Sequence, residues 1–86
     1  MKMLFILSQK YVKAVEAAHR MQLKSKQWKW LSKGEDVRGF REFLVVRAGD
    51  YLDKSDLVEI DRNILIGRGI EVTESEAMAI IKGDGK

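Results

Sequence analysis

The apolar segment Met3-Leu4-Phe5-Ile6-Leu7 is the strongest indication of the fold of this chain. Five consecutive apolar residues are typical of a strand that is buried on both faces, as strands of a parallel sheet are. Ser8 follows as a candidate helix N-cap. Between Gln9 and Leu23 the pattern becomes helical, because apolar residues recur at spacings of three and four: Tyr11, Ala14, Val15, Ala18 and Met21.

The middle of the chain repeats this alternation of strand and helix. A short strand is predicted over 28–31, and Ser32 with Glu35 forms a candidate capping box for a helix of one to two turns ending near Gly39. Residues 42–47, centred on Phe43-Leu44-Val45-Val46, give the clearest strand.

The last third supplies another helix, strand and helix. Apolar spacing favours a helix between Asp53 and Gly67, through Leu57, Ile60, Ile64 and Leu65, although 57–60 is also compatible with a strand. Gly67 and Gly69 are candidate helix stops, and 70–72 reads as a final strand. Thr73 and Glu76 form a second capping box for a short helix.

The order of these elements predicts the fold class. Four strands, each followed by a helix, imply a small three-layer α/β domain with a mostly parallel four-stranded sheet and flanking helices. We expect one domain over 1–82 and a disordered tail over 83–86. Right-handed crossovers place the carboxyl ends of the strands along one edge of the sheet.

Composition excludes several classes of function. The 86 residues are 45% hydrophobic and 34% charged, which suits one folded domain. No cysteine is present, so no thiolate can bind zinc or attack a substrate, and we expect no metal and no cofactor. The apolar start is too short for a signal peptide, and no stretch approaches the roughly 20 apolar residues that span a bilayer. A cytoplasmic location without membrane binding is predicted.

Ligands of parallel sheets bind beyond the carboxyl ends of the strands. Polar residues expected at this edge include Gln9, Gly34, Gly49, Thr73 and Glu74. Basic side chains and helix starts there suit an anion. The anion-binding candidates are Ser8, Lys10, Ser32, Lys33 and Arg47. An enzyme or ligand sensor at this edge would use Lys10, Lys33, Arg47 and Asp50.

Evidence for catalysis is missing from the sequence. Neither nucleotide-binding glycine motif is present, so the arrangement is Rossmann-like without a nucleotide-binding motif. His19, the only histidine, has no local partner and is read as a residue at the boundary of its helix. The acids between Asp50 and Asp61 are explained by their place near a helix start. We therefore expect no catalytic residues and no enzyme.

Trp28 and Trp30 lie two residues apart, so both face the same side of their strand and Lys29 faces the other. In a chain this small, burial of at least one tryptophan in the core is favoured. If exposed, the pair could instead anchor a protein partner. It could also stack on single-stranded nucleic acid, because lysines flank it.

A basic stripe is predicted on the first helix. Lys10, Lys13, Arg20 and Lys24 recur at near multiples of the helical turn. Such a stripe is most often a solvated helix face, but with Trp28 and Trp30 it forms a candidate surface for a partner or for nucleic acid. The net charge of +3 permits nucleic-acid binding without requiring it.

One segment has a wider likeness. Trp28-x-Trp30-Leu31-Ser32, then Asp36-Val37-Arg38-Gly39 and a second apolar strand, resembles small α/β proteins encoded by tailed bacteriophages, over roughly Met3 to Val72. The resemblance implies a phage or prophage origin and a role in binding a host protein. It implies no activity and no site residues.

Three functions stay open at this level. The first is a small non-catalytic binding protein that acts through a protein partner. The second is nucleic-acid binding through the basic helix face and the tryptophans. The third is anionic-ligand binding at the carboxyl edge. A homo-oligomer is also open, because short edge strands invite pairing.

Overall fold

The computed structural model describes residues 3–49 and 54–84. The strands are β1 (Leu4–Leu7), β2 (Trp28–Leu31), β3 (Leu44–Arg47) and β4 (Ile70–Glu71). The helices are α1 (Tyr11–Arg20), α2 (Lys54–Ile66) and α3 (Glu74–Asp84), with short 3₁₀ turns at Ser25–Gln27 and Gly34–Val37. The predicted alternation of strands and helices is confirmed, except that the 3₁₀ turn Gly34–Val37 stands where the second helix was predicted.

The four strands form one sheet in the order β2-β1-β3-β4, and every neighbouring pair is parallel. Leu4 pairs in register with Trp28 on one side and with Leu44 on the other. Strand β1 therefore lies inside the sheet, which is why its sequence is apolar at every position and all four residues are buried.

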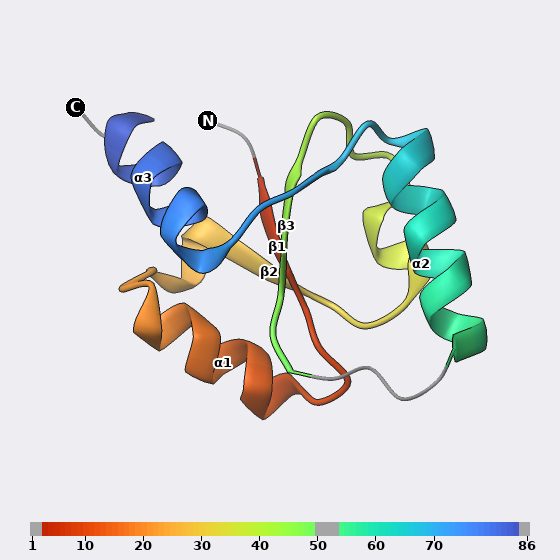
Figure 1. Ribbon diagram of the computed structural model, residues 1–86, viewed down its shortest axis with the longest axis horizontal. Coiled ribbons are helices and arrows are strands. Elements are labelled where there is room, and N and C mark those ends of the chain that lie inside the picture. The colour runs from red at the N-terminus through yellow and green to blue at the C-terminus, as the bar shows by residue number, and fades with distance from the viewer. Residues whose placement is uncertain (1–2, 50–53, 85–86) are drawn as a thin grey trace.

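Helices cover both faces of the sheet, as Figure 1 shows, with α1 and α3 on one side and α2 on the other. Alternate residues of β1 serve the two faces. Leu4 and Ile6 pack with the alanines of α1 and with Ala77 of α3. Phe5 and Leu7 pack with residues of β3, the 3₁₀ turn at Gly34–Val37 and α2. The predicted three-layer α/β fold is confirmed.

The predicted capping of the first helix is wrong. Helix α1 begins at Tyr11, so the N-cap residue is Lys10, which makes no side-chain cap hydrogen bond. Ser8 is instead buried, and its hydroxyl donates a hydrogen bond to the carbonyl of Lys10 at 2.8 Å. The helix also ends at Arg20, because Gln22 adopts a left-handed φ of 58°.

The capping box predicted from Ser32 and Glu35 is also wrong. The carboxylate of Asp36 accepts hydrogen bonds from the backbone N–H groups of Ser32 and Lys33, both at 2.9 Å. The chain forms only a 3₁₀ turn, Gly34–Val37, so the N-cap is Lys33 and the residue three further on is Asp36. The second predicted box is confirmed, since Thr73 and Glu76 exchange hydrogen bonds at 3.1 Å.

In helix α2, one residue that was predicted to lie on the buried face is exposed. Ile60 and Ile64 are buried, but Leu65 is 79% exposed and does not belong to the core. The helix ends as predicted before Gly67, yet the residue with left-handed φ is Arg68, at 59°. Helix α3 continues to Asp84, two residues into the predicted tail.

Membrane crossing is not supported by any helix within the described ranges, because none is both long and apolar enough.

Candidate functional site

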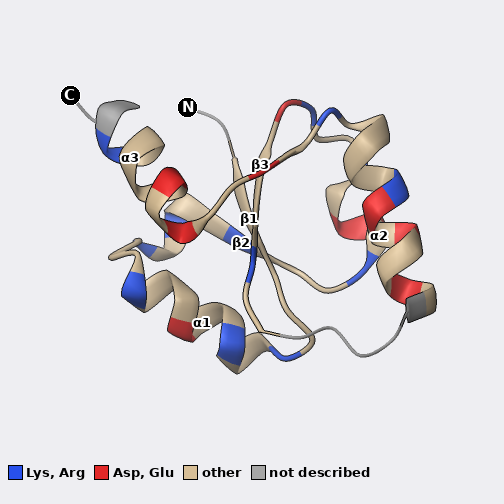
Figure 2. Ribbon diagram, in the orientation of Figure 1, with Lys and Arg blue, Asp and Glu red and all other residues tan. Residues whose placement is uncertain are grey.

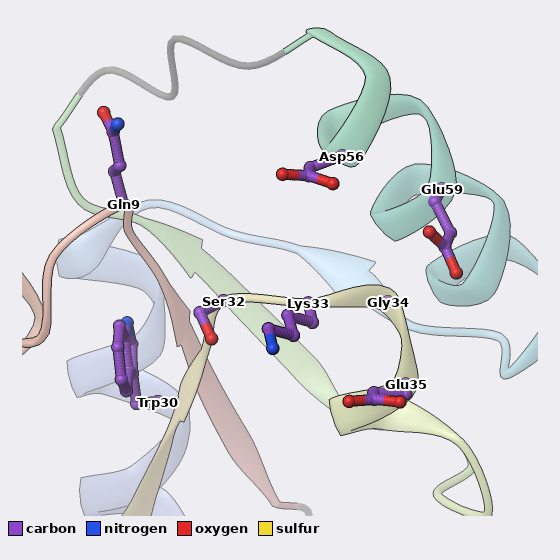
Figure 3. A pocket seen from close by; sticks show the side chains of 8 residues that line it. All are labelled: Gln9, Trp30, Ser32, Lys33, Gly34, Glu35, Asp56 and Glu59. Atoms are coloured by element: carbon purple, nitrogen blue, oxygen red, sulfur yellow. The ribbon is translucent and has the colours of Figure 1, made fainter.

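The carboxyl edge of the sheet contains a cavity, as the ligand-edge prediction expects. Its volume is about 520 Å³, and Figure 3 shows the side chains that line it from the end of β1, from β2 and the loop that follows it, and from α2: Gln9, Trp30, Ser32, Lys33, Gly34, Glu35, Asp56 and Glu59. In the order β2-β1-β3-β4 the chain adds β2 on one side of β1 and then β3 on the other, so the strand order reverses between β1 and β3 while all strands stay parallel. Open α/β sheets bind ligands at the carboxyl edge beside such a switch point.

The lining of this cavity carries more negative than positive side chains, whereas an anion requires a positive site. Its wall carries one ammonium group, that of Lys33, against the carboxylates of Glu35, Asp56 and Glu59. Three carboxylates repel a phosphate or a carboxylate ligand. In the residues that the structure describes, no group of three metal-ligating side chains is arranged to hold a cation.

The anion candidates are engaged in contacts of their own. The Ser8 hydroxyl accepts a hydrogen bond from Nε1 of Trp30 at 3.0 Å, and Asp36 holds the Ser32 backbone. Lys10 and Lys33 are exposed at the same edge.

Arg47, the remaining anion candidate, is held by two carboxylates. Its guanidinium donates to Glu71 of β4 and, at 2.6 Å, to Asp61 of α2. The hydrogen bond to Glu71 is the main cause that raises the pKa of Arg47, so this group stays charged. An anion at Arg47 would have to displace these carboxylates.

A cluster of three aromatic rings lies where α1 meets β2. The rings of Tyr11 and Trp28 stack with centroids 6.1 Å apart and planes 24° apart. Tyr11 meets Trp30 edge-on at 5.3 Å. Both tryptophans are partly buried against the core under α1. The prediction that at least one tryptophan is buried in the core is therefore met only in part, because neither side chain is fully buried. We call Tyr11, Trp28 and Trp30 the aromatic cluster.

The sequence does not identify Tyr11 as a member of this cluster. Its place in the apolar spacing of the first helix predicts a core residue, but the side chain is 54% exposed. Its contact with the two tryptophans depends on how α1 packs against β2, which no local sequence pattern shows.

Six exposed lysines surround this part of the molecule. They lie at the start of α1 and just before, within and after β2: Lys10, Lys13, Lys24, Lys26, Lys29 and Lys33. Lys13 is 3.7 Å from Glu16, and the ammonium group of Lys29 lies 5.9 Å from the centre of the Phe40 ring. We call this set the lysine group.

Charge is divided unevenly along the chain. Residues 1–34 contain eight Lys or Arg and one acid, whereas residues 35–86 contain eight Lys or Arg and twelve acids. Figure 2 shows the result in space, with basic positions along α1 and β2 and groups of acidic positions on α2 and at the start of α3. The modest overall charge of +3 conceals this asymmetry.

The predicted basic stripe is not one helix face. Lys10 is the N-cap of α1 and Lys24 lies beyond its end, so only Lys13 and Arg20 belong to the helix. Arg20 is paired with Glu74 of α3 through two hydrogen bonds of 3.0 Å. The hydrogen bond from Arg20 to Glu74 and the negative charge of Glu74 raise the pKa of Arg20. This ion pair joins α1 to α3.

Within the part of the chain that the structure describes, the remaining catalytic candidates are not assembled into a site. His19 is exposed near the end of α1. Asp50 and Asp53 lie outside the described residues, and the other acids of that group are Asp56, Glu59 and Asp61. Glu59 lies 3.9 Å from Arg38, and Asp61 binds Arg47.

Comparison with known proteins adds no family. No protein-family model matches the chain, and neither the curated proteins nor the solved structures include a significant match. The class of protein is therefore defined by its fold, a small parallel α/β domain with helices on both faces of a four-stranded sheet.

Proposed function

We propose that this chain is a small non-catalytic binding protein that acts through a protein partner, and that the partner contacts the aromatic cluster and the lysine group. One observation carries the proposal, namely the contact of three aromatic rings beside an edge strand, with Tyr11 54% exposed. Tyrosine and tryptophan are enriched among the residues that contribute most to protein interfaces.

The geometry of the cluster supports this role. The rings contact each other, and Nε1 of Trp30 is held by Ser8. A partner would therefore bind side chains that are already ordered, which lowers the entropy cost of association. The exposed lysines around the rings add long-range attraction for an acidic partner.

Nucleic-acid binding is the second candidate, and the lysine group is what favours it. Lysines near a surface bind phosphates without sequence preference, and aromatic rings stack on bases. Stacking needs open ring faces, however, and Tyr11 with Trp28 already occupy one face of each other. This arrangement favours the protein partner.

Anion binding at the carboxyl edge has the least support. The cavity there is lined by three carboxylates and one lysine, and the Arg47 guanidinium is engaged by Glu71 and Asp61. We therefore retain the proposal of a binding protein without catalysis.

The test compares two exposed positions on opposite sides of the sheet. Tyr11→Ala removes a ring from the aromatic cluster, whereas Val58→Ala truncates a side chain on α2 that is 59% exposed. Each tagged variant is used for capture from the cell that encodes the chain. The expected result is a stoichiometric protein bound by wild type and Val58→Ala and lost from Tyr11→Ala. Absence of such a protein, or equal retention by both variants, overturns the proposal.

The nucleic-acid candidate is tested in parallel. Fluorescence anisotropy with labelled single-stranded and double-stranded DNA is measured at about 20 mM and about 200 mM salt, because counterion release favours binding most at low salt. Tight, salt-sensitive binding that Tyr11→Ala weakens would favour nucleic acid over a protein partner.

The proposal also includes a phage or prophage origin and a cytoplasmic location, which rest on the resemblance and on the sequence. A gene located among phage structural or early genes would support the origin. A gene surrounded only by host metabolic genes would argue against it.

A further inference from the structure

The outer edge of β2 is open for hydrogen bonding. Strand β2 is the last strand on its side of the sheet. The N–H of Ser8 donates to the carbonyl of Leu31 at 3.2 Å, and the register places Phe5 beside Lys29. In a parallel pair, alternate residues point their N–H and carbonyl groups at the neighbouring strand and the others point them away. Lys29 and Leu31 therefore face β1, and the backbone of Trp30 faces outward.

This open stretch is short and has a defined end. Within the described ranges, no other backbone or side-chain group bonds the N–H or the carbonyl of Trp30. Beyond Leu31 the edge is closed, because Asp36 accepts the N–H groups of Ser32 and Lys33. A strand added here would pair with β2 alone.

The two faces of such an added strand would meet different chemistry. On the α1 face, Trp28 and Trp30 lie with Tyr11 beside the edge. On the opposite face, the ammonium group of Lys29 lies over the ring of Phe40. Side chains of a strand alternate between its faces, so apolar residues would meet the rings and acidic residues would meet Lys29.

The positive charge around β2 indicates which kind of strand can bind at its edge. A second copy of this chain paired through the same edge would bring two lysine groups together, which is unfavourable. An acidic segment complements Lys24, Lys26, Lys29 and Lys33, which all lie on or next to β2 and are exposed.

We propose that the β2 edge binds an extended acidic segment of the partner protein as a fifth strand, with apolar residues against the aromatic cluster and acidic residues toward Lys29. This inference rests on the proposed protein-binding function and specifies how the partner is bound.

The experiment uses synthetic peptides and the ¹⁵N-labelled full chain. The probe is a peptide of about six residues with alternating valine and glutamate. One control has the same composition with valines and glutamates in two blocks. Two further peptides carry N-methyl groups on alternate residues, in the two possible phases, so that one phase blocks pairing with β2. Amide shifts are followed up to about 1 mM peptide.

The expected result is a shift and slowed hydrogen exchange at the Trp30 amide with the alternating peptide. We expect binding weakened about fivefold or more in one N-methyl phase but retained in the other. Lys29→Glu should weaken binding about fivefold. The matched variant Arg62→Glu, which makes the same charge change at an exposed position of α2, should leave it unchanged.

Contrary outcomes separate this inference from the proposed function. If both N-methyl peptides bind as tightly as the parent peptide, strand addition is excluded, but binding through side chains stands. If no peptide shifts β2 while Tyr11→Ala still loses a captured partner, the fifth strand is wrong and the function stands. A single-stranded oligothymidylate is titrated in the same way as the peptides. If only this oligonucleotide shifts the amides of β2 and no protein is captured, both proposals fail.

Discussion

Replacing Gly69 by alanine is expected to destabilise the fold by forcing a methyl group into the ring of Phe43. A Cβ at Gly69 would lie 2.8 Å from Cζ of Phe43, closer still to its Cε2, and 2.9 Å from Cγ2 of Ile64. Phe43 is fully buried and its ring packs edge-on against Phe5 at 5.2 Å. The ring is therefore enclosed by core side chains, and a new methyl group would require it and its neighbours to shift.

The size of the effect follows from the cost of overpacking. An extra methyl group in a well-packed core costs about 1–3 kcal/mol. A domain of this length has a total stability of about 4–13 kcal/mol, so the loss is a substantial fraction of it. At about 4–8 °C of Tm for each kcal/mol, the variant should melt roughly 5–20 °C below wild type.

A double-mutant cycle identifies the cause. Phe43→Leu removes the ring atoms that the new methyl group would meet, and by itself should cost about 1–2 kcal/mol through the space it leaves. In that background Gly69→Ala should cost about 1 kcal/mol less than in wild type. Urea unfolding followed by tryptophan fluorescence measures all four proteins. An equal cost of Gly69→Ala in both backgrounds would refute the steric explanation.

Three further predictions concern the helix ends and Arg47. Arg68→Gly should raise the free energy of unfolding by about 0.5–1 kcal/mol in the same urea assay, because Arg68 holds a left-handed φ of 59°; a loss of stability would contradict this reading. Asp36→Ala should lower the free energy of unfolding by about 0.5–2 kcal/mol, because it removes the acceptor of two backbone N–H groups. Glu35→Ala should have little effect; an equal loss in both variants would mean that Glu35 also contributes to capping this turn. Inorganic phosphate at about 10 mM should leave Tm within about 1 °C of its value without phosphate, because Arg47 is already paired; a larger rise that Arg47→Met abolishes would place an anion site there.

The candidate site divides between what local sequence shows and what it does not. Trp28, Trp30 and the lysines beside them are recognisable from spacing alone, since a strand places alternate residues on one face. Tyr11 is not, because it contacts tryptophans that the fold brings close to it. Asp36 is not, because its short-range hydrogen bonds depend on the residue at which the turn begins. Tyr11 is exposed at the start of α1, and the role of Asp36 follows from a 3₁₀ turn at a place where the pattern predicts a longer helix.

Local patterns along the chain were enough to predict the class of fold. The apolar run of β1, the apolar centre of β3 and the capping pair Thr73 and Glu76 act through local burial and short-range hydrogen bonds, so their effect is readable along the chain. Only the folded arrangement establishes the strand order, the open edge of β2 and the pairing of Arg47 with acids of α2 and β4. These features join residues distant along the chain, and the free energy of such contacts depends on packing that no local pattern encodes.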